Sequence, residues 1–343
     1  MRSLLLLLLT TLALLTVASA ATAESDQNAI PDFVYGPPYV DTTNKPDTRR
    51  KTRFAFAGKA TLTARTWYVA WNGRVRGLRV SYPRVPPRRR IPLVLAFHGA
   101  GGRASCDTVF GDTPGRYGFI VACLDGQGVR SRGYSYAAPQ HLRDHSRIVT
   151  LLRERLPGLR IDWTRVIAAG GSMGGQEALV FGARYPQLVS TIVAMDAPTD
   201  LAARFWQLSR ERQLAIYTEC LGTPALAEDC FAERSPLTYA PALAGSSQTL
   251  LLYWSTKDSL SGASQSPALA RAIHAANPNR SFLLRIGAWR HGGAWSPAKG
   301  NLEWLADAGL VPEQERANTP YPTGWRIVVD ASVTLDDLPF YTP

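Results

Sequence analysis

The chain has 343 residues, of which 45% are hydrophobic and 19% are charged. This balance is typical of a globular protein with a substantial core, and it excludes a disordered or fibrous chain. The formal net charge is +11, but the basic residues are scattered apart from one cluster at Arg88–Arg90. We therefore interpret the charge as general surface character and predict no nucleic-acid partner.

The N-terminus has the order of charges and apolar residues that is typical of a secretory signal peptide. Arg2 is followed by an apolar run that reaches about Val17, and then by small residues that offer cleavage after Ala20 or Ala23. We predict a signal peptide over 1–23 and a secreted protein, extracellular or associated with the cell wall. The apolar run is shorter than the roughly 20 residues that cross a bilayer, so we expect no stable membrane span after cleavage, and an uncleaved anchor is the alternative.

Beyond the signal peptide, residues 24–60 are rich in polar residues and proline and predict an irregular N-terminal arm. Two β-leaning runs then flank Asn72-Gly73, a dipeptide that is typical of hairpin turns. Short, continuous apolar runs follow, and such runs are typical of strands buried on both faces of a parallel sheet. These runs are IPLVLAFHG, GFIVACLDG, RVIAAGG, STIVAMDAP, TLLLYWST and SFLLRIGA.

Between the apolar runs lie stretches with helical spacing, QHLRDHSRIVTLLRERL and MGGQEALVFGARY. Strands that alternate with helices predict an α/β fold with a mostly parallel central sheet and helices on both faces. We expect this domain to cover 61–310, with a small helical cap insertion at about 199–248 and a C-terminal tail over 311–343. Functional residues are then expected at the carboxyl ends of the strands.

One serine stands where such a strand meets a helix. Residues 170–174 form Gly-Gly-Ser-Met-Gly, which matches the G-x-S-x-G nucleophile elbow in the strand, turn and helix context that it requires. The glycines remove Cβ atoms that would collide with the neighbouring strand and helix. We therefore predict Ser172 as a nucleophile and the N–H of Met173, at the helix N-terminus, as an oxyanion donor.

A nucleophilic serine needs a base, and the base needs an orienting carboxylate. Of the five histidines, His291 follows the last strong strand in a Gly-rich loop, where the base lies in a chain order of serine, acid and histidine. Asp258 closes the preceding strand, and Asp196 closes the strand before that one. We favour Asp258 as the acid and keep Asp196 as the alternative.

The HGAGG loop after the first apolar run supplies backbone amides, so Gly99 or Ala100 is the predicted second oxyanion donor. The same loop supports a rival interpretation, because GAGGRA matches G-x-G-x-x-A and Asp125 ends the next strand, as in a dinucleotide site. The residues that follow contain glycine and proline where that motif needs a helix. An NAD-dependent oxidoreductase is therefore the less favoured hypothesis.

The four cysteines of an exported chain favour two disulfides, and we predict that neighbours pair: Cys106 with Cys123, and Cys220 with Cys230. The spacing leaves three connectivities open. No C-x-x-C or paired-histidine spacing supports a zinc site, so we predict no metal.

Four aromatic residues near strand-edge loops are candidates to line an acyl or sugar pocket, with core packing as the alternative. They are Tyr134, Tyr136, Trp289 and Trp295.

Several of these segments resemble the α/β-hydrolase superfamily. The resemblance rests on PLVLAFHGAGG, IDWTRVIAAGGSMGGQEAL, STKDSLSGASQSPALARAI and RHGG, and it covers about residues 60–310. It is specifically to secreted single-domain esterases of the feruloyl and polyhydroxybutyrate depolymerase type and to the catalytic domain of prolyl oligopeptidase-like enzymes. It implies Ser172 as nucleophile, Asp258 as acid and His291 as base, although SLSG stands where such enzymes usually have a Val-Pro-like stretch. The family's propeller domain is also not expected here.

We therefore predict a secreted serine hydrolase that cleaves a carboxylic ester through an acyl-enzyme, without a cofactor. The expected partner is a small-molecule or polymer-linked acyl substrate, with a carbohydrate-linked or aromatic acyl ester as the favoured class. A prolyl oligopeptidase-like peptidase is the main alternative, and a hydrolase fold retained as an inactive binding module is a further one. The oligomeric state stays open.

Overall fold

The computed structural model describes residues 50–70, 73–85, 87–102, 106–125, 133–261, 265–318 and 324–335. They belong to the larger of two compact units, Thr42–Pro343, while the other unit, Met1–Asp41, lies outside the described residues. The signal peptide over 1–23 therefore also lies outside them and stays a prediction. None of the described helices is long and apolar enough to cross a membrane.

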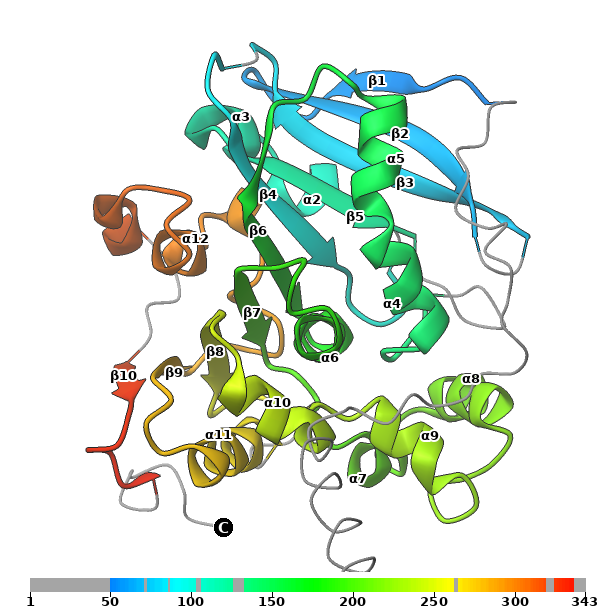
Figure 1. Cartoon of the computed structure of the whole chain (residues 1–343), viewed down its shortest axis with the longest axis vertical. Coiled ribbons are helices and arrows are strands. Elements are labelled where there is room, and N and C mark those ends of the chain that lie inside the picture. Colours follow the sequence, from blue (N-terminus) through cyan, green and yellow to red (C-terminus); the bar gives the residue numbers. More distant parts are fainter. Residues whose placement is uncertain are drawn as a thin grey trace, which may run out of the picture. The chain divides into compact units, whose positions relative to one another are not determined.

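A ten-stranded sheet forms the framework of the described unit, in the order β1-β2-β3-β5-β4-β6-β7-β8-β9-β10 (Figure 1). The strands from β5 to β9 in this order are parallel, and the strands at both ends are antiparallel. This confirms the predicted α/β-hydrolase fold. The strands are β1 (Arg53–Phe56), β2 (Thr61–Val69), β3 (Val75–Pro83), β4 (Ile91–Phe97), β5 (Ile120–Leu124), β6 (Ile161–Gly171), β7 (Thr191–Met195), β8 (Thr249–Ser255), β9 (Phe282–Gly287) and β10 (Trp325–Val329).

At the two ends of the sheet, the sequence patterns predicted the hairpin but did not predict the edge strands. The predicted hairpin is present as β2 and β3, with Val69 opposite Val75 and Gly73 at a φ of 74°. The N-terminal arm was predicted to be irregular, but it contains β1, which pairs with β2. β10, from the predicted tail, pairs with β9. Both edge strands are short and largely exposed, so they carry little hydrophobic period that could reveal them.

The helices cover both faces of the sheet, because successive side chains of a buried strand point to opposite sides. In β4, Leu93 and Leu95 join the core cluster that α4, α5, α6, α10 and α11 cover, whereas Val94 and Ala96 join the cluster that α2 and α12 cover. The helices are α2 (Cys106–Phe110), α3 (Thr113–Tyr117), α4 (Pro139–Ser146), α5 (Ile148–Arg155), α6 (Met173–Arg184), α7 (Leu201–Phe205), α8 (Arg210–Cys220), α9 (Glu228–Glu233), α10 (Ala240–Gly245), α11 (Gln265–Ala276) and α12 (Glu303–Asp307), with short 3-10 turns η1 (Pro236–Tyr239), η2 (Pro297–Lys299) and η3 (Glu313–Asn318).

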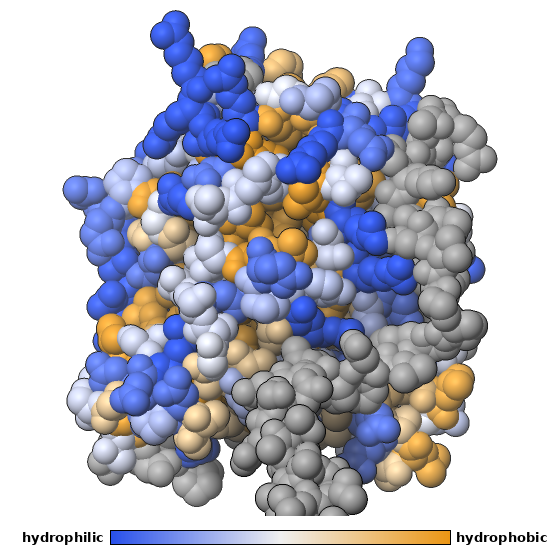
Figure 2. Space-filling model, in the orientation of Figure 1, coloured by the Kyte–Doolittle hydropathy of each residue, from blue (hydrophilic) through white to orange (hydrophobic). Residues whose placement is uncertain are grey.

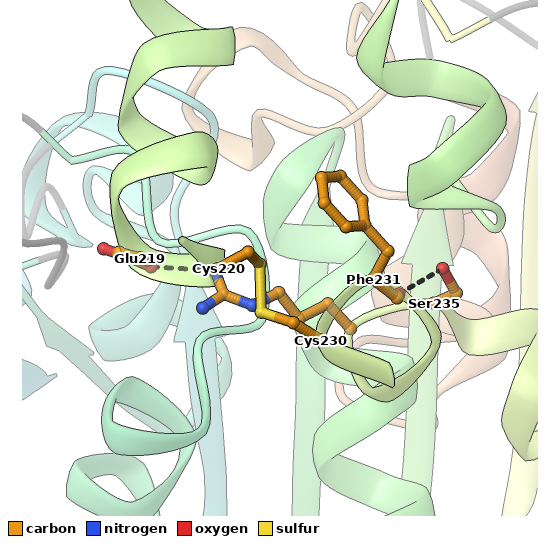
Figure 3. The surroundings of a disulfide bond; sticks show 6 residues. Glu219, Cys220, Cys230, Phe231 and Ser235 are labelled. Atoms are coloured by element: carbon orange, nitrogen blue, oxygen red, sulfur yellow. Dashed lines mark hydrogen bonds and ion pairs between the residues drawn. A yellow bond between two sulfur atoms is a disulfide. The ribbon is translucent and has the colours of Figure 1, made fainter. Parts of the chain in front are cut away.

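The predicted cap segment holds α7, α8, α9 and α10, between β7 and β8. A disulfide joins Cys220 at the end of α8 to Cys230 in α9, as predicted (Figure 3). Beside it, Arg234 forms an ion pair with Glu219 at 2.8 Å. Cys123 is also in a disulfide, and the side chain of its predicted partner, Cys106, lies outside the described residues.

The surface agrees with the scattered distribution of charge in the sequence. Figure 2 shows hydrophilic side chains spread over the face in view, with hydrophobic residues between them.

Candidate active site

Ser172 lies between β6 and α6, in a backbone conformation that few residues with a side chain adopt. Its φ is 58° and its ψ is −130°, and its N–H donates to Met195 O at 2.8 Å. A Cβ on Gly170 would lie 2.3 Å from the carbonyl of Gly174, and a Cβ on Gly174 would lie 2.2 Å from Phe97 O. Only glycine fits at these two positions, so the glycines around Ser172 are what permits the sharp turn.

Two hydrogen bonds connect Ser172 to the predicted base and acid. The Ser172 hydroxyl donates to His291 Nε2 at 2.6 Å, and His291 Nδ1 lies 2.8 Å from Asp258 Oδ1. Asp258 comes directly after β8, and His291 lies in the loop after β9, so the topology brings three distant segments to one edge of the sheet. An ionised Asp258 holds the Nδ1–H tautomer of His291 and leaves Nε2 free to accept the serine proton.

The surroundings of Asp258 favour its ionised form. Burial by itself would raise the pKa of Asp258, but the hydrogen bond and charge of His291 lower it. The N–H groups of Leu260 and Ser261, which donate to Oδ1 at 2.8 and 3.1 Å, lower it further. The balance puts the pKa of Asp258 below its usual value.

Asp196, the alternative acid, has a different position. It is 1% exposed, and its Oδ2 accepts hydrogen bonds from Gly292 N–H and Trp289 Nε1–H, both at 2.8 Å. Its Oδ1 accepts from Ser255 N–H at 3.0 Å, and burial is the main reason why its pKa is raised to about 6. Asp196 therefore anchors the loop that carries His291, while Asp258 is the carboxylate that His291 contacts. Sequence reasoning weighed these residues as rivals and missed that both serve one histidine.

Asp196, Asp258 and His291 each offer a donor atom within 4.8 Å of the others, which is close enough for a metal ion. In this structure, hydrogen bonds already engage these groups: the Asp258 and His291 atoms contact each other, and both Asp196 oxygens accept N–H groups. The arrangement therefore fits transfer of the Ser172 proton to His291, with Asp258 stabilising the imidazolium that forms.

The predicted oxyanion donors lie on either side of the elbow. Among the described residues, the N–H groups of Gly99, Ala100 and Met173 have no acceptor. The loop is held by hydrogen bonds from Gly101 N–H to Gly133 O at 2.8 Å and from Gly102 N–H to Gly99 O at 3.0 Å. It is close to the elbow, since a Cβ on Gly99 would have Gly171 O as its nearest atom at 3.9 Å.

The dinucleotide hypothesis finds no support in the same loop. After the glycines the chain forms α2 and α3, two helices of five residues each, instead of the single long helix that the motif needs. The carboxylate of Asp125 accepts a hydrogen bond from Gly77 N–H at 3.0 Å, which gives it a structural role between strands.

The four aromatic candidates do not form one pocket. Trp289 is 1% exposed and bound to Asp196, and Tyr136 is 2% exposed and packs with Met173, so the structure places both in the core. This corrects their predicted place in a pocket lining. Trp295 stacks on Trp304 with ring centroids 5.0 Å apart and borders the elbow at Gly171. Tyr134 is half-buried beside Gly101 and is the aromatic candidate nearest to the oxyanion loop.

A buried glutamate that sequence reasoning missed supports this region. Glu177 in α6 is fully buried, and it accepts hydrogen bonds from Ser135 Oγ at 2.5 Å and Ala137 N–H at 3.3 Å. Tyr136 and Ala137 have positive φ values of 41° and 55°. Glu177 thus stabilises the strained segment that places Tyr134 and Tyr136 beside the elbow. Its position five residues after Ser172 on the elbow helix was the available signal.

A cavity of about 480 Å³ lies at the opposite edge of the sheet from this site. It is lined by Thr249, Phe282 and their neighbours, at the N-terminal ends of β8 and β9. Ser172, Asp258 and His291 lie at the carboxyl ends of the strands, so this cavity is not part of the candidate active site.

Residues 115–308 match the prolyl oligopeptidase family, and this range contains Ser172, Asp258 and His291. The chain belongs to the prolyl oligopeptidase family. Membership agrees with the α/β-hydrolase fold and with the geometry of Ser172, His291 and Asp258 described above. A serine hydrolase-like protein from Danio rerio is 30% identical over 125 residues, which cover 34% of this chain and 36% of that protein. The family member described here thus spans about a third of that relative.

Solved structures share the fold of this family member at low identity. An S-formylglutathione hydrolase from Agrobacterium tumefaciens aligns with a TM-score of 0.56 at 15% identity, over 76% of this chain and 98% of that one. The acylaminoacyl peptidase of Pyrococcus horikoshii gives 0.56 at 14% identity, over 80% and 43%. An esterase from Pyrobaculum calidifontis gives 0.51 at 17% identity, over 68% and 76%. The chain covers 35% of the dipeptidyl peptidase 4 of Porphyromonas gingivalis.

Proposed function

We propose that this family member is a serine hydrolase that cleaves a carboxylic ester through an acyl-enzyme. The observation that carries the proposal is the continuous chain of hydrogen bonds from Ser172 Oγ through His291 to Asp258. A serine hydroxyl held 2.6 Å from an imidazole nitrogen, with a carboxylate on the other nitrogen, is the arrangement of a catalytic triad.

In this scheme Ser172 Oγ attacks the acyl carbonyl carbon while its proton passes to His291 Nε2. The N–H of Met173 and that of Gly99 or Ala100 stabilise the negative charge on the carbonyl oxygen. His291 then gives its proton to the departing alcohol oxygen, which leaves an ester between Ser172 and the acyl group. Water attacks that ester, with His291 as base, and the acid is released with Ser172 restored.

The choice of an ester draws support from the extent of the structural matches. The S-formylglutathione hydrolase is covered over 98% of its length, whereas the acylaminoacyl peptidase is covered over 43%. Cleavage of a peptide bond by the same triad is the second candidate, and membership of the prolyl oligopeptidase family favours it. A carbohydrate-linked or aromatic acyl ester remains the proposed substrate class, and secretion through residues 1–23 remains part of the proposal.

The test compares hydrolysis of p-nitrophenyl acyl esters with that of matched aminoacyl p-nitroanilides. We expect the esters to be cleaved and Ser172→Ala to abolish that cleavage. Efficient anilide cleavage that depends on Ser172 would make the protein a peptidase. A fluorophosphonate that fails to label Ser172 in the folded protein would contradict both candidates and favour a binding module.

A further inference from the structure

Among the described residues, three arginines are buried, and one of them lacks an acidic partner. Arg234 pairs with Glu219 at 2.8 Å, and Arg285 pairs with Asp307 at 2.6 Å. Arg204 is 6% exposed, yet its side chain makes a single hydrogen bond, from Nη1 to the neutral amide oxygen of Gln207 at 2.8 Å. Its Nε and Nη2 have no acceptor in the described part of the chain.

Neither Nε nor Nη2 of Arg204 is a fully buried donor without a partner, so the unused edge of the guanidinium keeps contact with solvent. Burial lowers the pKa of Arg204, but a guanidinium stays protonated at any physiological pH. A guanidinium whose N–H donors are only partly used is suited to bidentate binding of a carboxylate. The missing partner of Arg204 is therefore expected to be an anion that arrives from outside the chain.

The position of Arg204 connects it to the active site. Leu201 and Phe205, on the same short helix α7, pack in one hydrophobic cluster with Tyr136 and with Met173, the residue after the nucleophile. The charge of Asp258 and the Tyr136 hydroxyl both act on the Arg204 guanidinium. Among the described residues, no ion pair joins Arg204 to Asp258, whose Oδ1 accepts hydrogen bonds from His291, Leu260 and Ser261.

A second arginine faces the same region from α8. The Arg212 guanidinium lies 5.9 Å from the centre of the Tyr134 ring, and that ring borders the oxyanion loop at Gly101. Glu211 lies in the same region, with its Oε2 3.4 Å from the Tyr134 hydroxyl. Arg204 and Arg212 thus place two guanidinium groups near the oxyanion loop.

The cap holds Arg204 in place before any ligand binds. The side-chain oxygen of Gln265 accepts hydrogen bonds from Thr199 N–H and Asp200 N–H, both at 2.7 Å, at the start of α7. Asp200 caps the helix by accepting from Ala203 N–H at 3.0 Å. The Cys220–Cys230 disulfide joins α8 to α9 in the same cap. These bonds orient α7, and with it Arg204, before a ligand binds.

We propose that Arg204, supported by Arg212, binds a carboxylate of the substrate, so that the enzyme prefers esters that carry a second, free carboxyl group near the scissile bond. Half-esters of dicarboxylic acids and esters of carboxylate-bearing alcohols are the chemical class that fits. The inference rests on the proposed hydrolysis of esters and adds the charge of the substrate. Arg204 and Arg212 act here in substrate binding, apart from the bond-breaking steps at Ser172.

The experiment measures kcat/KM for pairs of substrates that differ only in charge. The first pair is p-nitrophenyl hydrogen glutarate and its methyl ester, with the carboxylate on the acyl side. The second pair is 4-carboxyphenyl butyrate and its methyl ester, with the carboxylate on the alcohol side. We expect the charged member of one pair to be preferred by roughly tenfold or more, and that pair identifies the side that Arg204 contacts.

The variants then assign the preference to residues. Arg204→Gln should bring the ratio of charged to neutral kcat/KM close to one, Arg204→Lys should keep part of it, and Arg212→Gln should reduce it. Arg210→Gln is the matched control, because Arg210 is an exposed arginine of the same helix as Arg212 and should keep the ratio. Thermal unfolding gives an independent readout: Arg204→Met should leave Tm close to the wild-type value, since the replacement removes one hydrogen bond, to Gln207.

The outcomes separate the two proposals. If the wild-type protein cleaves neutral esters through Ser172 but shows no preference for charged ones, the carboxylate site is wrong and the hydrolase proposal stands. If no ester of either kind is cleaved, the proposed function itself fails. A lower Tm for Arg204→Met, together with equal loss of activity on both members of a pair, would make Arg204 a structural residue of the cap.

Discussion

The replacement Asp196→Asn tests whether a second carboxylate positions the His291 loop. The Asp196 carboxylate accepts three N–H groups, from Gly292, Trp289 and Ser255. An asparagine offers one oxygen and one NH2 group, so at least one of these donors loses its acceptor, at a cost of about 1–3 kcal/mol. The shape of the side chain is unchanged, which confines the perturbation to hydrogen bonding and charge.

The same replacement also removes a buried charge, and this works in the opposite direction. The pKa of Asp196 is raised from 3.8 to about 6, so the ionised group costs the folded state about 3 kcal/mol at neutral pH. Because the folded-state pKa is the higher one, this group's favourable contribution is present below about pH 4 and is lost as the pH rises through about 6. At neutral pH the two effects are similar in size, and we expect the variant to fold with a stability close to that of the wild type.

Activity should nevertheless fall in Asp196→Asn, because the loop that carries His291 loses part of its anchor. A displacement of about 1 Å at His291 costs roughly 100-fold in kcat. The assays are kcat on a p-nitrophenyl ester and denaturant unfolding at about pH 4 and about pH 7. The difference in tryptophan fluorescence between the variant and the wild type reports the lost Nε1 hydrogen bond of Trp289. An unchanged kcat in a variant whose tryptophan emission has shifted would refute the positioning role. If the stability of Asp196→Asn still rose toward acid pH, the raised pKa of Asp196 would be refuted.

Three further replacements test the rest of the site and the fold. Asp258→Asn should lower kcat by about 10⁴-fold without unfolding the protein, since it removes the acceptor that sets the His291 tautomer; stopped-time ester assays beside circular dichroism check this, and retention of more than a tenth of the activity would contradict the triad. Gly174→Ala should prevent formation of the elbow, because its Cβ would meet Phe97 O at 2.2 Å; a large drop in Tm is expected, and a normal Tm with full activity would refute the steric argument. The double replacement Cys220→Ser and Cys230→Ser should destabilise the cap by about 3 kcal/mol, because it restores the loop entropy of the unfolded chain. Denaturant unfolding of the wild type with and without reductant, beside the double variant, measures this loss of stability. Identical unfolding curves would contradict it.

Local chemistry is what allowed the site residues to be predicted from the sequence. Ser172 could be assigned because the glycine spacing of an elbow is a steric requirement that acts over five residues. Asp258 and His291 could be placed because each follows a buried strand, and parallel strands end at a common edge. The parallel strands were visible for the same reason: burial on both faces makes the run of apolar residues continuous in the sequence itself.

Other features depended on contacts between segments that are distant in sequence. Asp196 and Asp258 both close apolar strands, and only the packing of β7, β8 and β9 decided that one contacts His291 while the other anchors its loop. Trp289 became part of the core because its indole N–H found Asp196, and β1 and β10 joined the sheet through pairing that their exposed sequences do not reveal. Arg204 is one of 38 basic residues in the sequence. Its significance arises because the fold buries it on the helix that packs against Met173, and leaves it without the carboxylate that each of the other two buried arginines has. Burial and pairing are properties of neighbours in space.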